Sequence, residues 1–186
     1  LERGAFYPEK MFGYECQSAK KLAALLEDTR KEKVDIEPIL DQAEKELSIC
    51  LSVKQKEAVR KAFACPVSII TGGPGTGKTT IQKVLLYINE HTEKRTVLLT
   101  APTGRASRRM AESTGHDGSS TMHSALGLGM EEEEGAGFDF LEAGFILADE
   151  FSMVDMRLGY EFLSRIHSGT RLVLIGDVDQ LHSVGS

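Results

Sequence analysis

The 186-residue sequence predicts an α/β fold, in which a parallel β-sheet carries helices on both faces and follows a helical N-terminal segment. Two observations predict it. From residue 67 onward, four short β-branched or apolar runs alternate with stretches of helical periodicity. Each run also passes directly into polar residues, and ligands of such sheets bind at the carboxyl ends of the strands. We therefore expect these polar residues to meet at one edge.

The first third of the chain has only helical periodicity, so residues 1–50 are expected to form a helical segment ahead of a domain over 51–186. Asp35 is a candidate N-cap, and Pro38 fits only the first turn of the helix that follows. Ser52 and Gln55 have the spacing of a capping box, and Cys65-Pro66 ends the helix that they begin. The apolar positions that define these helices are Ala19, Leu22, Ala23, Leu26, Ile36, Ile39, Leu40, Ala43, Leu47, Ala58, Val59, Ala62 and Phe63.

The sheet is expected from strands at 67–71, 96–101, 144–148 and 171–176. Helices are expected near 79–91, 103–114 and 155–167. The acidic block at 131–134 lies beside glycines and is interpreted as a solvated loop or hairpin tip, with a metal or partner site as the alternative.

A glycine-rich turn joins the first strand to the next helix. Gly72, Gly77, Lys78 and Thr79 meet the pattern G-x-x-x-x-G-K-[ST] of a P-loop. The glycines let backbone N–H groups point at phosphate oxygens, and the helix that follows adds its free N–H groups and dipole. Lysine then reaches the β- and γ-phosphates, and the threonine hydroxyl holds Mg²⁺. The expected ATP-binding residues in this turn are Gly73, Pro74, Gly75, Thr76, Gly77, Lys78, Thr79 and Thr80.

Acidic residues end two later strands. Asp149 and Glu150 follow an apolar run, as in a Walker B strand, so Asp149 is expected on Mg²⁺ and Glu150 as the general base. Residues 176–180 follow the last strand, and Gln180 there could reach the γ-phosphate or the attacking water. Taken alone, both segments could be solvent-facing turns.

Two further segments have competing interpretations. Gln55 could cap its helix or read the edge of adenine, and the local pattern favours the cap. Three arginines, at 105, 108 and 109, begin the helix after the second strand, which suits contacts to a nucleic-acid backbone but also a solvated helix face. His123 has no partner at metal-ligand spacing, so packing or capping is favoured, with Thr121 starting a short helix.

Composition restricts the class of protein. The net charge of -6 argues against a chain-wide nucleic-acid surface, although a local basic groove is compatible with it. The three cysteines are far apart, as in a reducing cytosol, and no run is long enough to cross a membrane, so we expect a cytoplasmic protein without a membrane partner. Leu1 is not a start methionine and the last residues look cut within a motif, so a fragment is expected.

Several motifs in one order resemble superfamily 1 DNA helicases of the RecD/TraA type. The resemblance covers nearly the whole chain, including the helical lead-in FYPEKMFGYECQSAKKLAALL. The segments that carry it are LSVKQKEAV, GGPGTGKTT, APTGRAS, STMHSAL, ADEFSMVD and LIGDVDQLHSVGS.

The resemblance implies the first RecA-like domain of an ATP-dependent DNA helicase, using ATP and Mg²⁺ to move 5′ to 3′ on single-stranded DNA in repair, recombination or conjugation. It favours an adenine contact over the cap as the role of Gln55, and it implies that Gln180 couples the γ-phosphate to DNA. The residues that it places toward single-stranded DNA are Thr103, Gly104, Arg105, Thr121 and His123.

The chain departs from the family pattern at three positions. Phe151 replaces a small residue beside the expected base, Ala148 replaces a β-branched residue, and His182 replaces a proline. The resemblance also implies a second RecA-like domain that supplies arginines to the γ-phosphate, and other recombination subunits as possible partners. Without that domain the chain is expected to turn ATP over poorly. The alternatives are a P-loop ATPase or kinase with another substrate, and a nucleotide-dependent switch or assembly domain without motor action.

Overall fold

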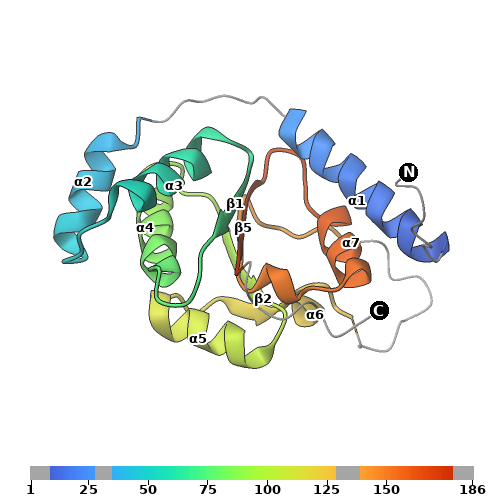
Figure 1. Cartoon of the computed structure of the whole chain (residues 1–186). Coiled ribbons are helices and arrows are strands. Elements are labelled where there is room, and N and C mark those ends of the chain that lie inside the picture. Colours follow the sequence, from blue (N-terminus) through green and yellow to red (C-terminus); the bar gives the residue numbers. More distant parts are fainter. Residues whose placement is uncertain (1–8, 28–34, 129–138, 178–186) are drawn as a thin grey trace.

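The computed structural model describes residues 9–27, 35–128 and 139–177. Within these ranges the chain forms a five-stranded parallel sheet with helices on both faces, which confirms the predicted fold class (Figure 1). The order across the sheet is β1-β5-β4-β2-β3. The strands are β1 (Val67–Thr71), β2 (Val97–Ala101), β3 (Ser119–Thr121), β4 (Phe145–Ala148) and β5 (Arg171–Gly176).

Two short elements were not predicted. Among the described residues the strand β3 pairs only with β2, at the edge of the sheet, and its three residues are polar and half-buried. A 3₁₀ turn, η1 (Phe151–Met153), follows β4. The helices are α1 (Glu9–Glu27), α2 (Glu37–Glu46), α3 (Val53–Ala64), α4 (Lys78–His91), α5 (Gly104–Thr114), α6 (Met122–Ala125) and α7 (Met156–Ser164). Among the described residues, no helix has both the length and the apolar character that crossing a membrane requires.

The two N-terminal helices lie on opposite faces of the sheet. Helix α1 packs along α7, where Tyr14 stacks on Tyr160 with ring centroids 5.1 Å apart, and α2 packs against α4 (Figure 1). Pro38 occupies the first turn of α2, as predicted. The prediction for Asp35 was off by one residue: Ile36 is the N-cap, while the Asp35 carboxylate accepts a hydrogen bond from the N–H of Glu37 at 3.2 Å.

Alternation along the central strands divides the core into two layers. In β4, Phe145 and Leu147 face the layer under α2, α3 and α4, whereas Ile146 and Ala148 face the layer under α1, α6 and α7. All four side chains are fully buried, as expected of a parallel strand covered on both faces. The small side chain of Ala148 therefore faces a packed layer.

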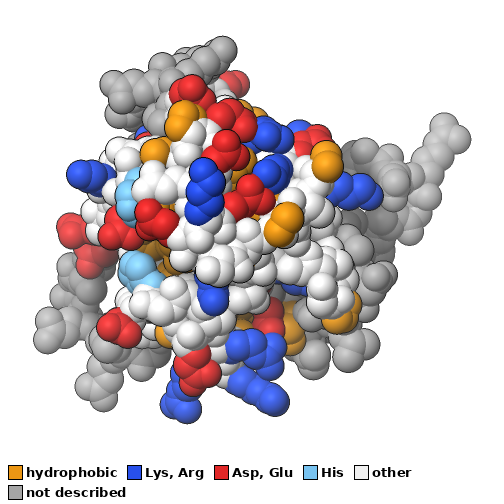
Figure 2. Space-filling view, turned by 90° about the vertical axis from the view of Figure 1, so that its left-hand side faces the viewer, with side chains coloured by type: hydrophobic (Ala, Val, Ile, Leu, Met, Phe, Trp, Pro, Cys, Tyr) orange, Lys and Arg blue, Asp and Glu red, His pale blue; other side chains and the backbone are white. Residues whose placement is uncertain are grey.

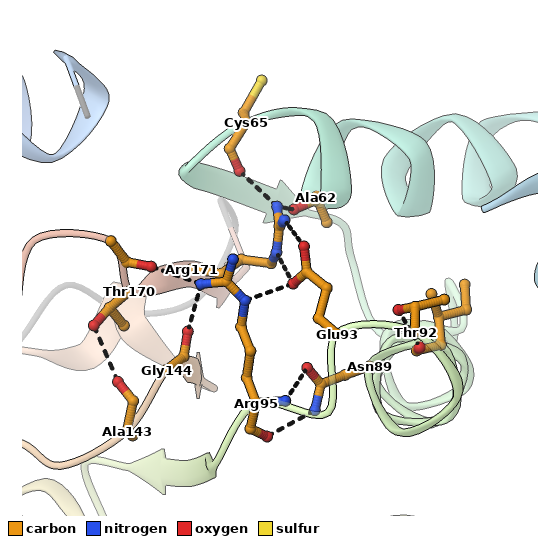
Figure 3. Close-up of polar contacts among 12 residues, drawn as sticks. Ala62, Cys65, Asn89, Thr92, Glu93, Arg95, Ala143, Gly144, Thr170 and Arg171 are labelled. Carbon is orange, nitrogen blue, oxygen red and sulfur yellow. Dashed lines mark hydrogen bonds and ion pairs between the residues drawn. The ribbon is translucent and has the colours of Figure 1, made fainter. Parts of the chain in front are cut away.

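Figure 3 shows a charged cluster at the edge where the strands begin. Glu93 forms ion pairs with Arg171 at 2.6 Å and with Arg95 at 2.7 Å. Arg171 also donates to the carbonyl oxygens of Ala62 and Cys65, and its guanidinium lies 5.0 Å from the centroid of the Phe63 ring. The cluster joins the ends of α3 and α4 to the starts of β2 and β5.

Candidate functional site

Polar residues that follow β1, β4 and β5 meet at the carboxyl edge of the sheet, as the strand pattern predicted. They line a cleft of about 410 Å³ between the P-loop (residues 72–80) and one side of α5. Residues 102–105, which were expected to join them after β2, do not line this cleft. The aligned register places the strand ends together, with Thr71 opposite Gly176 and Ala148 opposite Leu174. The lining residues are Gly73, Pro74, Gly75, Thr76, Gly77, Lys78, Thr79, Gln82, Ala106, Arg109, Met110, Ser113, Asp149, Glu150, Gly176 and Asp177.

The P-loop has two positions where a side chain would not fit. Gly77, the N-cap of α4, has a left-handed backbone with φ of +85°, and a Cβ there would lie 2.3 Å from Nε2 of Gln55. At Gly72 a Cβ would lie 2.5 Å from Oγ1 of Thr76. That hydroxyl closes the turn by donating to the carbonyl oxygen of Gly73 at 2.8 Å. Glycine at both positions thus permits the tight turn that leads into α4.

Lys78, in the first turn of α4, reaches back across the loop. Its ammonium group donates to the carbonyl oxygens of Gly72 and Gly73 and lies 3.5 Å from the Asp177 carboxylate. Asp177, directly after β5, is only 3% exposed, so this negative charge lies against the lysine inside the protein. The sequence placed Asp177 only in a strand-end turn. Its position after an apolar strand was the available signal.

The two acidic residues after β4 differ in their surroundings. Asp149 accepts hydrogen bonds at both carboxylate oxygens, from the Glu150 N–H and from Nε2 of Gln82, each at 2.8 Å. Glu150 has a left-handed backbone with φ of +51°, which is uncommon for a residue with a side chain. Such strain is typical of residues whose side chains must be held in a particular direction. The sequence did not single out Gln82, because one buried amide in a helix has no distinctive spacing.

Gln55 forms the cap that the sequence favoured and also contacts the P-loop, while the adenine contact stays a prediction. Its Oε1 accepts from the Ser52 N–H at 2.8 Å, and its own N–H donates to the Ser52 hydroxyl, which confirms the capping box. At the same time its Nε2 donates to the carbonyl oxygen of Thr76 at 3.0 Å. One amide therefore connects the start of α3 to the P-loop.

Helix α5 forms the far wall of the cleft through Arg109, Met110 and Ser113, none of which was predicted there. Arg109 also borders a second hollow, of about 520 Å³, with Arg105, Arg108, Gly104 and Glu112. Figure 2 shows the face of the molecule that carries α2, α4 and α5, and basic side chains gather at its lower edge, where α5 lies. A local basic surface thus exists on a chain with a net negative charge.

Of the five residues that the resemblance placed toward DNA, four lie together. The Thr103 hydroxyl caps α5 by accepting from the Ala106 N–H, and the Thr121 hydroxyl caps α6 by accepting from the Ser124 N–H. Thr121 therefore starts a short helix, as predicted. Gly104 and Arg105 follow Thr103, and a Cβ at Gly104 would lie 3.9 Å from Cγ2 of Thr121. His123 is exposed on α6.

The remaining predicted positions divide into packed residues and residues outside the described ranges. The Phe151 ring is directed toward the core, 6.0 Å from the ring of Phe162. At the start of α4, Thr79 is exposed and lines the cleft, whereas Thr80, also expected there, is half-buried and does not line it. Gln180, His182 and the acidic block at 131–134 lie outside the described residues.

The chemistry of the cleft suits a polyphosphate. One wall carries free N–H groups at the start of α4 and the ammonium group of Lys78, which attract anions. The other carries the carboxylates of Asp149 and Glu150, which would repel an anion without a cation between them. An anion bound together with a divalent cation satisfies both walls.

Sequence comparison places the chain among known proteins. Residues 55–186 match a family described as AAA domain. The RecBCD enzyme subunit RecD of Haemophilus influenzae is 35% identical over 70% of this chain and 24% of its own length. The ATP-dependent RecD2 DNA helicase of Deinococcus radiodurans is 36% identical over 72% of this chain and 18% of its own length. The chain thus spans about a quarter or less of these two relatives.

A comparison of structures agrees with this placement. The crystal structure of the Pif1 helicase from Candida albicans aligns with a TM-score of 0.52 and 29% identity, over 74% of this chain and 34% of that one. The family match over residues 55–186 includes the parallel sheet and the P-loop. The chain therefore belongs to the AAA domain family and, within it, to the RecD-type superfamily 1 helicases.

Proposed function

We propose that this chain binds and hydrolyses ATP as the first RecA-like domain of a DNA helicase that moves on single-stranded DNA. The observation that carries the proposal is the convergence of Lys78, Asp149 and Glu150 on one cleft beside the P-loop. The names of the RecD2 and Pif1 relatives describe helicases, and the former is called ATP-dependent.

The P-loop would hold the triphosphate. Backbone N–H groups of residues 73–80 would donate to the α- and β-phosphates, as in other P-loops. Lys78 would turn from the carbonyl oxygens of Gly72 and Gly73 to the β- and γ-phosphates. The shift replaces neutral acceptors with charged ones, which form stronger hydrogen bonds.

Thr79 and Asp149 would hold Mg²⁺. Both offer oxygen atoms, the ligands that Mg²⁺ prefers, and the ion is usually held by one or two carboxylates together with substrate phosphates. Within residues 9–27, 35–128 and 139–177, no group of three His, Cys, Asp or Glu could by itself hold a metal ion. Phosphate oxygens of the nucleotide would complete the site. The bound ion would neutralise charge that develops on the phosphates.

Glu150 would accept the proton of the attacking water. It lines the cleft next to Asp149 with a left-handed backbone, and its carboxylate would face the end of the γ-phosphate. Gln180, which lies outside the described residues, would couple the state of the γ-phosphate to DNA. Gln55 would read adenine, and its Nε2 would then exchange the Thr76 carbonyl for the base.

Single-stranded DNA would run past the start of α5 and α6, over Thr103, Gly104, Arg105, Thr121 and His123. Backbone N–H groups at helix starts and the guanidinium groups of α5 suit phosphate contacts, which position nucleic acid without reading its sequence. A second RecA-like domain would supply arginines to the γ-phosphate, and movement would run 5′ to 3′ in repair, recombination or conjugation. The Haemophilus relative is named as a subunit of the RecBCD enzyme, so other recombination subunits are candidate partners.

The experiment is steady-state ATP hydrolysis by the protein that carries this chain, with and without single-stranded DNA. We expect DNA to raise the rate, and Glu150→Gln to abolish hydrolysis while ATP still binds. Hydrolysis that DNA does not stimulate would favour an ATPase or kinase with another substrate. Tight ATP binding with negligible turnover and no unwinding would favour a nucleotide-dependent switch.

A further inference from the structure

One buried amide in the cleft has no role in the proposed function so far. Gln82 lies in the second turn of α4, is 1% exposed, and donates from Nε2 to Oδ2 of Asp149 at 2.8 Å. We propose that Gln82 is a positioning residue, which fixes the Asp149 carboxylate opposite the Thr79 hydroxyl so that the two can share one divalent cation. The inference rests on the magnesium site of the proposed function.

Helix geometry places Gln82 where this role requires it. It follows Lys78 by four residues and Thr79 by three, so all three side chains lie on the same face of α4. Its hydrogen bond therefore connects the helix that carries the expected hydroxyl ligand to the strand that carries the expected carboxylate ligand. The relative position of the two ligands then depends on this contact.

The Asp149 carboxylate has little else to orient it. Rotation about the terminal bond of an aspartate side chain is broad and roughly two-fold. Among the described residues, the only other hydrogen bond to its oxygens comes from the N–H of Glu150, the next residue in the chain. A carboxylate has about four lone-pair positions, so two hydrogen bonds leave acceptor positions free for a cation or its water. Partners that hydrogen-bond to a metal ligand typically change metal affinity by about 10- to 100-fold when they are removed.

A purely structural role would also explain a buried glutamine whose amide has a hydrogen-bond partner. The structural role and the positioning role differ in which property of the protein they control. A merely structural amide would affect the stability of the fold and the cleft as a whole. A positioning amide would affect the cation and leave the metal-free affinity for a triphosphate unchanged. The gain in ATP affinity that Mg²⁺ produces therefore separates them.

The test measures the dissociation constant of a fluorescent ATP analogue for the purified chain, in EDTA and in excess Mg²⁺, for wild type and Gln82→Met. Methionine has a similar length and no N–H donor. We expect the metal-free affinity to stay within about twofold and the gain from Mg²⁺ to fall at least about tenfold. A direct titration with Mn²⁺, followed by its electron paramagnetic resonance signal, should show the same loss.

Asn89 provides a matched control on the same helix. It is a buried amide, 3% exposed, whose side chain bonds to the backbone of Arg95 at the opposite edge of the sheet. Asn89→Ala should lower the melting temperature and leave the gain from Mg²⁺ unchanged. If Gln82→Met does not fold, Gln82→Ala removes the donor without adding a group to the cleft. It is judged by the same quantity, the gain in ATP affinity that Mg²⁺ produces.

The outcomes distinguish the inference from the function on which it rests. A variant with the wild-type gain from Mg²⁺, or with equal losses in EDTA and in Mg²⁺, would overturn the role of Gln82 alone. Wild-type protein that binds no triphosphate, or gains nothing from Mg²⁺, would overturn the proposed site and this inference with it.

Discussion

The ammonium group of Lys78 lies 3.5 Å from the carboxylate of Asp177, across the junction of the P-loop and β5. Two neighbouring strands of the sheet thus supply the opposite charges, since β1 leads into the P-loop and pairs directly with β5. A phosphate that binds Lys78 must compete with this carboxylate and with the carbonyl oxygens of Gly72 and Gly73, which the ammonium group also contacts.

We predict that Asp177→Asn tightens the binding of metal-free ATP by about threefold or more. The substitution removes a negative charge from a cleft that must hold a polyanion, and partly buried charges at such distances interact by about 1–4 kcal/mol. Isothermal titration calorimetry in EDTA measures the change. Weaker binding by a folded variant would mean that Asp177 holds Lys78 in the binding position instead of competing with the phosphate.

A second prediction compares two glycines of the P-loop. Gly77→Ala should lower the free energy of unfolding by at least about 1 kcal/mol, because alanine is strained at φ of +85° and its Cβ would collide with the Gln55 amide. Gly73→Ala should stay within about 0.5 kcal/mol, since a Cβ there would meet no atom within 4 Å. Urea unfolding of both variants checks the pair, and equal losses would contradict the geometry of the loop.

The third prediction concerns the charged cluster at the opposite edge. Glu93→Gln should lower the free energy of unfolding by about 3 kcal/mol, because it leaves the buried Arg171 without its countercharge. ATP affinity should not change. The exposed pair of Glu57 and Lys61 is the control, and Glu57→Gln should have no measurable effect on stability. A loss of ATP affinity in folded Glu93→Gln would show that the two edges are coupled.

The fourth prediction is a dependence of stability on pH. Hydrogen bonds from the Lys56 ammonium and the Leu51 N–H hold the pKa of Glu44 below its usual value. The stabilisation is therefore complete above the unfolded pKa of about 4.3 and is lost as the pH falls through the lower folded value. Melting temperatures of wild type and Glu44→Gln should differ most at neutral pH and converge in acid. A difference that is constant with pH would exclude this ionisation as the cause.

Elements with apolar runs and clear end signals could be predicted from the sequence. The strands at 67–71 and 171–176 were predicted with their observed bounds, because each ends at the polar or glycine residues that begin a loop. The strand β3 could not be predicted, since Ser119, Ser120 and Thr121 form no apolar run and gain strand geometry only by pairing with β2. The strand order also depends on contacts between distant segments, which periodicity does not encode.

The parts of the site that could be predicted are those whose residues stand at a characteristic spacing in the sequence. The P-loop glycines, Lys78 and the Asp149-Glu150 pair have characteristic neighbours in the sequence, and they meet in the cleft. Gln82 and Arg109 have no such neighbours for a role in the cleft, and Asp177 had only its position after an apolar strand, because these contacts come from the packing of α4, α5 and β5. Gln55 illustrates the limit, since the sequence predicted its cap but not its contact with the Thr76 carbonyl of the P-loop.

The central claim is that the P-loop binds a nucleoside triphosphate through Lys78. Its most direct test is the affinity of the purified chain for ATP with Mg²⁺, compared between wild type, Lys78→Ala and Lys83→Ala, in which an exposed lysine of the same helix is removed. We predict that Lys78→Ala weakens binding at least about tenfold, or about 1.4 kcal/mol, while Lys83→Ala binds as wild type does. A folded Lys78→Ala variant that binds ATP with wild-type affinity would contradict the account.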